Sequence, residues 1–151
     1  MMSLWTLKEV VSSFASELFA TASNTDVRVW NALKREELLR IIIPNTACRV
    51  IGFNKTGSSL ITGWSDGKIR AFGPETGRLQ FEITDAHKSG SVTSFAVTDP
   101  INQAGDFKII SGGDDGEVRI WKITGNSWAL EAALKEHKGK PLFSQNSKST
   151  C

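Results

Sequence analysis

Three residues of the kinds that build an activated serine nucleophile occur in the second half of the chain: His87, Ser111 and Asp115. A histidine beside a serine can accept the hydroxyl proton, and a carboxylate can orient the imidazole and stabilise its charged form. Such a site would also need an oxyanion-binding group and a substrate cleft, and no motif marks either one. A hydrolase that uses Ser111 and His87 is one hypothesis for this chain, but the positions of these residues favour another.

The same residues belong to a pattern that occurs three times. Each copy runs from a short apolar segment, through a turn with Asn or Asp, into a segment that ends on an aromatic residue. The copies are FATASNTDVRVW (19–30), ITGWSDGKIRAF (61–72) and ISGGDDGEVRIW (110–121), and their closing aromatics are 42 and 49 residues apart. A period of about 40–45 residues with a closing Trp is typical of a β-propeller blade. The sequence therefore predicts an all-β fold of WD40-type blades, about three four-stranded antiparallel sheets in an open ring.

Within each copy, apolar or alternating stretches are separated by Gly, Asn and Asp turns, which predicts four strands per repeat. In the second repeat the predicted strands are 47–53, 58–63, 68–72 and 78–83. In the third they are 91–97, 107–112, 117–123 and 127–134, with a long loop at 98–106. The last of these contains strong helix formers, yet its apolar residues alternate as in a strand, and the repeat favours strand. In the shortened first repeat they are 9–13, 18–22, 26–30 and 37–43.

The repeats divide the chain into five predicted segments. They are an atypical N-terminus (1–6), a partial WD blade (7–44), two WD blades (45–86 and 87–137) and a disordered tail (138–151). The tail is rich in Lys, Ser and Gly and has no apolar period, which predicts disorder.

In this frame, four residues of the third repeat resemble the WD-repeat tetrad of a loop His, a strand Ser or Thr, a turn Asp and a strand Trp. They are His87, Ser111, Asp115 and Trp121. The carboxylate can accept from the imidazole and from turn N–H groups, the imidazole can bond the hydroxyl, and the hydroxyl can accept from the indole. We interpret the set as a structural network that locks the strands of one blade together, and not as a catalytic triad.

The other repeats keep this network in part. The matching residues are Thr62, Asp66 and Phe72 in the second repeat and Asn24 and Trp30 in the first. Phe72 cannot donate a hydrogen bond, Pro44-Asn45 stands where Gly-His is expected, and Ala20 stands where the first hydroxyl is expected.

An arginine recurs two residues before each closing aromatic, at Arg28, Arg70 and Arg119. A row of guanidinium groups could bind carboxylates of a ligand. Recurrence at a position fixed by the repeat more often follows from architecture, so we interpret these side chains as polar cover for the outer part of each blade.

Composition excludes several other classes of function. The net charge of +2 is too small to indicate nucleic-acid or membrane binding, and no apolar stretch approaches the length of a membrane span. The beginning of the chain lacks a basic leader, so no secretory signal is expected. The two cysteines, Cys48 and Cys151, make no disulfide framework and suit a reducing compartment such as the cytoplasm. The two histidines, His87 and His137, suggest no metal cluster, and GGDDG (112–116) reads as a hairpin turn, so no cofactor is expected.

Four phrases carry a closer resemblance: REELLRI (35–41), DGKIRAFGPETGRLQFEI (66–83), ISGGDDGEVRIW (110–121) and LEAALKEHK (130–138). Over about residues 7–138 the sequence resembles the family of cilia- and flagella-associated protein 52, a family of WD-repeat proteins. The loop phrase FGPETGRL is more specific than any WD dipeptide.

The resemblance implies a component of motile cilia and flagella. Members of the family carry many WD repeats folded as two adjoining propellers, and they are bound inside the axonemal doublet microtubules beside tubulin. This chain would then be a middle portion of about three blades, with tubulin and axonemal proteins as partners. The segments at 1–6 and 141–151 replace blade sequence that the resemblance leads us to expect.

The leading hypothesis is therefore a non-catalytic scaffold of the axoneme. The alternative is a WD-repeat adaptor that presents peptide-binding loops to a signalling or ubiquitin-ligase assembly. Propellers close with typically about 4–8 blades, so three blades leave two open faces. We expect these faces to pack against the rest of a propeller or against a second copy of the chain, and the isolated chain to be poorly soluble or oligomeric without such a partner.

Overall fold

The computed structural model describes residues 7–13 and 17–135, and all regular structure in these ranges is β-strand. Twelve strands form three four-stranded sheets, and every neighbouring pair is antiparallel. No described helix is long and apolar enough to cross a membrane. The predicted N-terminal segment (1–6) and tail (138–151) lie outside the described residues, and so does His137.

Each sheet is built from strands that are consecutive in the chain. The first sheet contains β1 (Leu7–Ser12), β2 (Leu18–Ser23), β3 (Val27–Asn31) and β4 (Glu36–Ile41). The second contains β5 (Cys48–Phe53), β6 (Leu60–Trp64), β7 (Ile69–Phe72) and β8 (Leu79–Ile83). The third contains β9 (Val92–Val97), β10 (Phe107–Gly113), β11 (Val118–Thr124) and β12 (Ser127–Leu134).

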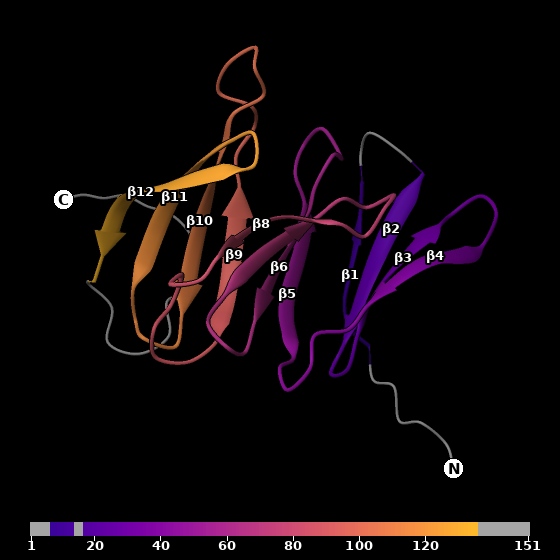
Figure 1. The fold of residues 1–151 in the computed structure, drawn as a ribbon, viewed down its shortest axis with the longest axis horizontal. Helices are drawn as coiled ribbons and strands as arrows, with labels where there is room; N and C mark the ends of the chain where they lie inside the picture. The colour runs from indigo at the N-terminus through magenta and orange to yellow at the C-terminus, as the bar shows by residue number, and fades with distance from the viewer. Residues whose placement is uncertain (1–6, 14–16, 136–151) are drawn as a thin grey trace.

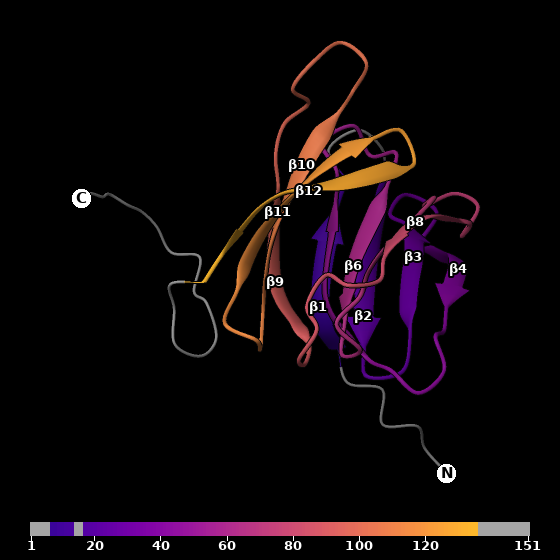
Figure 2. The ribbon, with the colours of Figure 1, turned by 60° about the vertical axis from the view of Figure 1, so that its left-hand side comes forward.

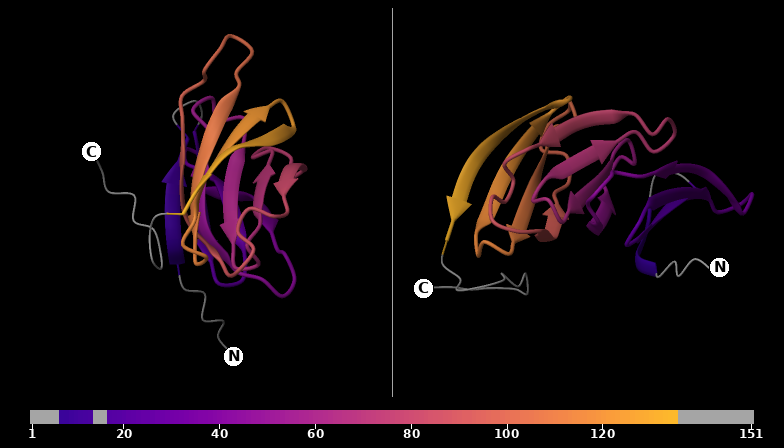
Figure 3. Two further views of the ribbon diagram at one scale, coloured as in Figure 1. Left: turned by 90° about the vertical axis from the view of Figure 1, so that its left-hand side faces the viewer. Right: turned by 60° about the horizontal axis from the view of Figure 1, so that its bottom comes forward.

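The three sheets stand side by side in chain order, as the blades of a propeller do (Figure 1). The innermost strands β1, β5 and β9 lie next to one another, and the outer strands lie farther apart (Figure 3). The loop between β9 and β10 projects beyond the neighbouring turns (Figure 2). The turns between the second and third strands of the second and third blades are short, and Gly67 (φ 80°) and Gly116 (φ 78°) supply the left-handed backbone there.

Two apolar cores hold the blades together. The core between the first and second blades consists of Leu18, Ala20, Ala22, Val27, Val29, Ile41, Cys48, Ile51, Leu60, Trp64 and Phe72. The core between the second and third blades consists of Ile61, Ile69, Ala71, Phe81, Ile83, Ala86, Val92, Phe107, Ile109, Trp121 and Ile123. Neighbours on β6, Leu60 and Ile61, enter different cores because successive strand side chains point to opposite faces. The second blade is therefore buried on both faces.

The structure confirms the predicted all-β fold and the predicted strands, with ends that differ by one or two residues. The stretch 127–134, with its mixed helix and strand signals, is strand β12. Although the first repeat is predicted to be shortened, β1–β4 form a complete four-stranded sheet. Its shorter period comes from shorter turns and not from a missing strand.

Candidate functional site

The third blade brings His87, Ser111, Asp115 and Trp121 into one chain of hydrogen bonds. Nδ1 of His87 lies 2.9 Å from Oδ1 of Asp115, and Nε2 lies 3.0 Å from Oγ of Ser111. The indole N–H of Trp121 donates to the same Ser111 oxygen over 3.0 Å. The residues come from a loop, β10, a turn and β11, so the bonds join four separate segments.

Local backbone structure fixes the histidine in this position. The His87 N–H donates to the carbonyl of Gly67, in a turn of the preceding blade, over 2.9 Å. The imidazole lies against Gly113, where an added Cβ would come within 2.4 Å of the ring. Only glycine at residue 113 leaves room for the ring, and this explains the second glycine of the Gly-Gly pair that precedes the acidic turn.

The electrostatics favour a neutral imidazole. Burial lowers the pKa of His87, and this effect outweighs the hydrogen bond that the imidazole donates to Asp115, which acts in the opposite direction. Burial alone would raise the pKa of Asp115, but the backbone N–H of Glu117 and the imidazole of His87 lower it below its usual range. With its proton on Nδ1, neutral His87 donates to Asp115 and accepts from the Ser111 hydroxyl, which in turn accepts from Trp121.

This arrangement matches a serine triad in its contacts, but its environment differs from that of a nucleophile. Ser111 is 0% exposed and His87 is 2% exposed, so solvent does not reach the hydroxyl. The indole N–H of Trp121 already occupies the Ser111 oxygen that would attack a substrate. The geometry therefore suits a buried cross-link between strands and loop.

The second blade completes its network with a residue that sequence reasoning missed. Trp64, at the end of β6, donates its indole N–H to Thr62 Oγ1 over 2.7 Å. The Thr62 hydroxyl then donates to the carbonyl of Arg70 over 2.7 Å. Phe72 is buried at the closing position without a hydrogen-bonding group, as its side chain requires. The indole thus supplies the donor that Phe72 lacks.

Strand register shows where Trp64 stands in the repeat. Thr62 pairs with Arg70 on β7 just as Ser111 pairs with its arginine on β11, so Trp64 corresponds to Gly113. The Trp64 side chain therefore starts from the place that the His87 ring fills in the third blade. A large side chain in the strand replaces a ring from the loop. The sequence carries a signal for this exchange. The second repeat lacks the loop histidine, and it has Trp64 where the third repeat has Gly113.

The predicted turn residue of the second blade, Asp66, does not reach a histidine. Its carboxylate pairs with Arg70 at 2.8 Å, and the same guanidinium pairs with Glu82 at 2.8 Å. Arg70 also lies over the Trp64 ring, with its Cζ 5.4 Å from the ring centroid. Asp66 therefore connects to the network through an arginine.

In the first blade, the hydroxyl lies one residue away from its predicted position. Thr21 pairs with Arg28, as Ser111 pairs with Arg119, so Thr21 and not Ala20 is the equivalent residue. The turn between β2 and β3 is one residue shorter than the corresponding turns of the other blades. Counting back from the closing aromatic residue through this turn therefore gives Ala20 in place of Thr21.

The indole of Trp30 donates to Thr21 Oγ1 over 3.0 Å, and its ring stacks on Phe19 with centroids 6.0 Å apart. Trp30 is only partly buried, unlike Trp121 at the same position of the third blade. Asn24, the remaining predicted residue, is exposed at the tip of the turn.

The three recurring arginines pair with carboxylates of their own blades. The pairs are Arg28 with Asp26 (3.1 Å), Arg70 with Asp66 (2.8 Å) and Arg119 with Glu117. These contacts agree with the interpretation of the arginines as cover for each blade. Among the residues that the structure describes, no group of three or more His, Cys, Asp or Glu side chains could hold a metal ion.

Comparison with known proteins finds one matching family model and several similar sequences. Residues 78–122 match the model of the WD domain, G-beta repeat family. Cilia- and flagella-associated protein 52 of Sus scrofa is 50% identical over 133 residues, and that of Homo sapiens is 48% identical over the same length. The protein of this name from Chlamydomonas reinhardtii is 48% identical over 124 residues. These alignments cover 87%, 87% and 82% of this chain, which spans about a fifth of the length of each relative (20%, 20% and 19%).

Two solved structures share the fold at low sequence identity. The computationally designed Ika4 protein superposes with a TM-score of 0.74 at 16% identity, covering 92% of this chain and 78% of its own. A chain in the crystal structure of the mitotic checkpoint complex superposes with a TM-score of 0.68 at 17% identity, covering 89% of this chain and 38% of its own. At these identities the likeness concerns the fold alone.

Proposed function

Because this chain is a WD-repeat protein homologous to a segment of cilia- and flagella-associated protein 52, we propose that it acts as a non-catalytic scaffold of the ciliary and flagellar axoneme. The observation that carries the proposal is the sequence identity, over most of the chain, with relatives that are named for cilia and flagella. In its finer form the proposal places the protein on doublet microtubules, on their inner side and beside tubulin, as the family resemblance implies.

The structure supports a scaffold through its rigidity. The blades are cross-linked by buried hydrogen bonds and joined by two apolar cores. The His87, Ser111, Asp115 and Trp121 set is a structural tetrad in this proposal, because its hydroxyl is inaccessible. We propose three WD blades at 7–44, 45–86 and 87–137, with residues 1–6 and 138–151 outside them. Loops at the ends of the strands would then supply the partner contacts.

Cosedimentation tests the proposal directly. The full chain is mixed with purified axonemal doublets, and we expect it to pellet with them and to remain bound through high-salt extraction. The chain alone, spun under the same conditions, controls for aggregation through its open blade faces. A chain that stays in the supernatant with doublets present would overturn the axonemal assignment. A pull-down that returns ligase or signalling subunits and no tubulin would favour the adaptor alternative.

A further inference from the structure

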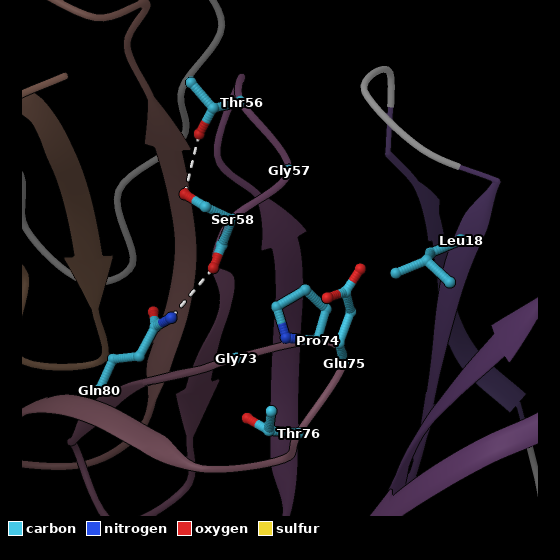
Figure 4. Close-up of a pocket in the computed structure, with 9 residues that line it drawn as sticks. All are labelled: Leu18, Thr56, Gly57, Ser58, Gly73, Pro74, Glu75, Thr76 and Gln80. Atoms are coloured by element: carbon cyan, nitrogen blue, oxygen red, sulfur yellow. Dashed lines mark hydrogen bonds between the residues drawn. The ribbon is translucent and has the colours of Figure 1, made fainter.

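A pocket of about 440 Å³ lies where the first blade meets two turns of the second (Figure 4). Its walls include Leu18 at the start of β2, Thr56 and Ser58 in the β5–β6 turn, and Pro74 and Glu75 in the β7–β8 turn. The volume is within the range of protein sites that take small groups. The pocket lies away from the buried networks of the blades.

The polar floor of the pocket is rigid because its groups are bonded to one another. The Gln80 amide donates to the Ser58 carbonyl over 3.0 Å, and its oxygen accepts from the Ser59 hydroxyl over 2.6 Å. The Asn54 amide donates to Ser58 Oγ over 3.0 Å, and Thr56 Oγ1 lies 2.9 Å from the same oxygen. Gln80 thereby ties strand β8 to the β5–β6 turn.

These bonds leave one charged group in the pocket uncommitted. Glu75 is exposed at the rim of the pocket, and within the described part of the chain its carboxylate takes part in no hydrogen bond or ion pair, so it is available to a partner from solution. The lining of the pocket also includes two buried apolar side chains, Pro74 next to Glu75 and Leu18 on the first blade (Figure 4). An apolar slot that ends at a carboxylate fits a long side chain with a cationic end.

The turn that carries this carboxylate is peculiar to the second blade. It is FGPETG, whereas the corresponding turn of the first blade carries Lys34 and Arg35, and that of the third is the short Gly125-Asn126 turn. Gly77 has φ 72° and its N–H donates to the Gly73 carbonyl over 2.7 Å, which closes the turn. Neither contact uses the Glu75 side chain, so blade packing gives no reason for a carboxylate there.

We propose that this pocket receives a lysine or arginine side chain of a protein partner. The aliphatic stem lies between Leu18 and Pro74, and the cationic end pairs with Glu75. The inference deepens the scaffold function and rests on it for the existence of a partner, while the pocket chemistry stands on the contacts above. It goes beyond that function in naming the residue type that the partner contributes.

Nuclear magnetic resonance of the full ¹⁵N-labelled chain tests the pocket. The probes are the blocked tripeptides acetyl-Gly-Lys-Gly-amide and acetyl-Gly-Arg-Gly-amide, with acetyl-Gly-Gln-Gly-amide as the neutral control. We expect saturable shifts of the Thr56, Gly57 and Thr76 amides with the basic peptides only. Glu75→Gln should weaken binding about tenfold, and Glu36→Gln, on exposed β4, should leave it unchanged.

Glu75→Lys provides a second variant that keeps the test decisive, since it should bind acetyl-Gly-Glu-Gly-amide in place of the basic peptides. Equal shifts with the neutral peptide, or none with the basic ones, would overturn the proposal. If the peptides fail and the chain still cosediments with doublets, the pocket inference is wrong and the scaffold stands. If the peptides bind and the chain does not cosediment with doublets, the pocket binds basic side chains and the axonemal scaffold proposal is wrong.

Discussion

The indole N–H of Trp64 donates to Thr62 Oγ1 over 2.7 Å, from two residues farther along the same strand. In the third blade the corresponding hydroxyl is contacted by His87, which arrives from a loop and lies against Gly113. The two blades thus fill one position of the fold with different rings. The repeat conserves a buried polar contact, although the residue that makes it has moved.

Removing the indole N–H should destabilise the chain without changing its shape. Trp64→Phe keeps an aromatic ring but leaves the Thr62 hydroxyl without its buried donor, so we expect a loss of about 1–2 kcal/mol in the free energy of unfolding. Urea titration measures it. Trp128→Phe is the matched control, because that indole is 38% exposed and water can replace its bond to the Glu82 carbonyl. Equal losses for the two variants would contradict the buried role of Trp64.

The fold could be predicted from the sequence because its signals are local. Alternating apolar residues and Gly-Asp turns mark each strand, and the aromatic period assigns strands to blades. The network of the third blade was also predictable, since His87, Ser111, Asp115 and Trp121 all lie at their expected offsets. The structure joins them in series by hydrogen bonds of 2.9 Å and 3.0 Å.

The networks of the other two blades were less predictable, for physical reasons. In the second blade the Trp64 ring, which comes from a strand, occupies the position that the His87 ring, which comes from a loop, occupies in the third. Spacing along the sequence does not reveal that two residues from different segments can fill the same position. Thr21 was hidden because alignment through a turn assumes a constant turn length. Pairing across the strands, Thr21 with Arg28, gives the right residue. Strand register therefore identifies equivalent residues of the blades more reliably than spacing along the sequence does.

Ser111→Ala separates the structural role of the serine from the catalytic one. The change leaves the indole N–H of Trp121 and Nε2 of His87 without a partner in a dry site, so we expect a loss of about 1–3 kcal/mol in the free energy of unfolding. Ser94→Ala is the control in a neighbouring strand, because the Ser94 hydroxyl is buried without a hydrogen-bond partner in the described structure and its removal should cost little. Esterase activity that Ser111→Ala abolishes and Ser94→Ala keeps would support the hydrolase hypothesis.

Stability should depend on pH through His87. Its pKa in the folded protein lies below the ordinary value, so the unfolded chain binds protons more readily as the pH falls. The contribution of His87 is therefore complete above about pH 6.5 and is lost as the pH falls below this value. Asp115, whose pKa is also lowered, acts in the same direction in more acidic solution.

Urea unfolding at neutral and at mildly acidic pH measures this slope. The variant His87→Gln should be less stable at neutral pH and should show a smaller drop on acidification. An equally steep drop in that variant would mean that other groups control the acid sensitivity.

The thiol of Cys48 should be nearly inert in the folded chain. It is 3% exposed in the core between the first two blades, and burial raises its pKa to about 12. Since the thiolate is the reactive form, only roughly one molecule in 10⁴ would be ionised at pH 8. In a Cys151→Ser background, which leaves Cys48 as the single thiol, iodoacetamide should label the folded chain far more slowly than the urea-unfolded chain. The labelling rate should also keep rising through pH 9 and 10, where an ordinary thiol would already level off. Native labelling at the unfolded rate, with a plateau near the ordinary pKa, would mean that the first and second blades separate in solution, because only their separation exposes this sulfur.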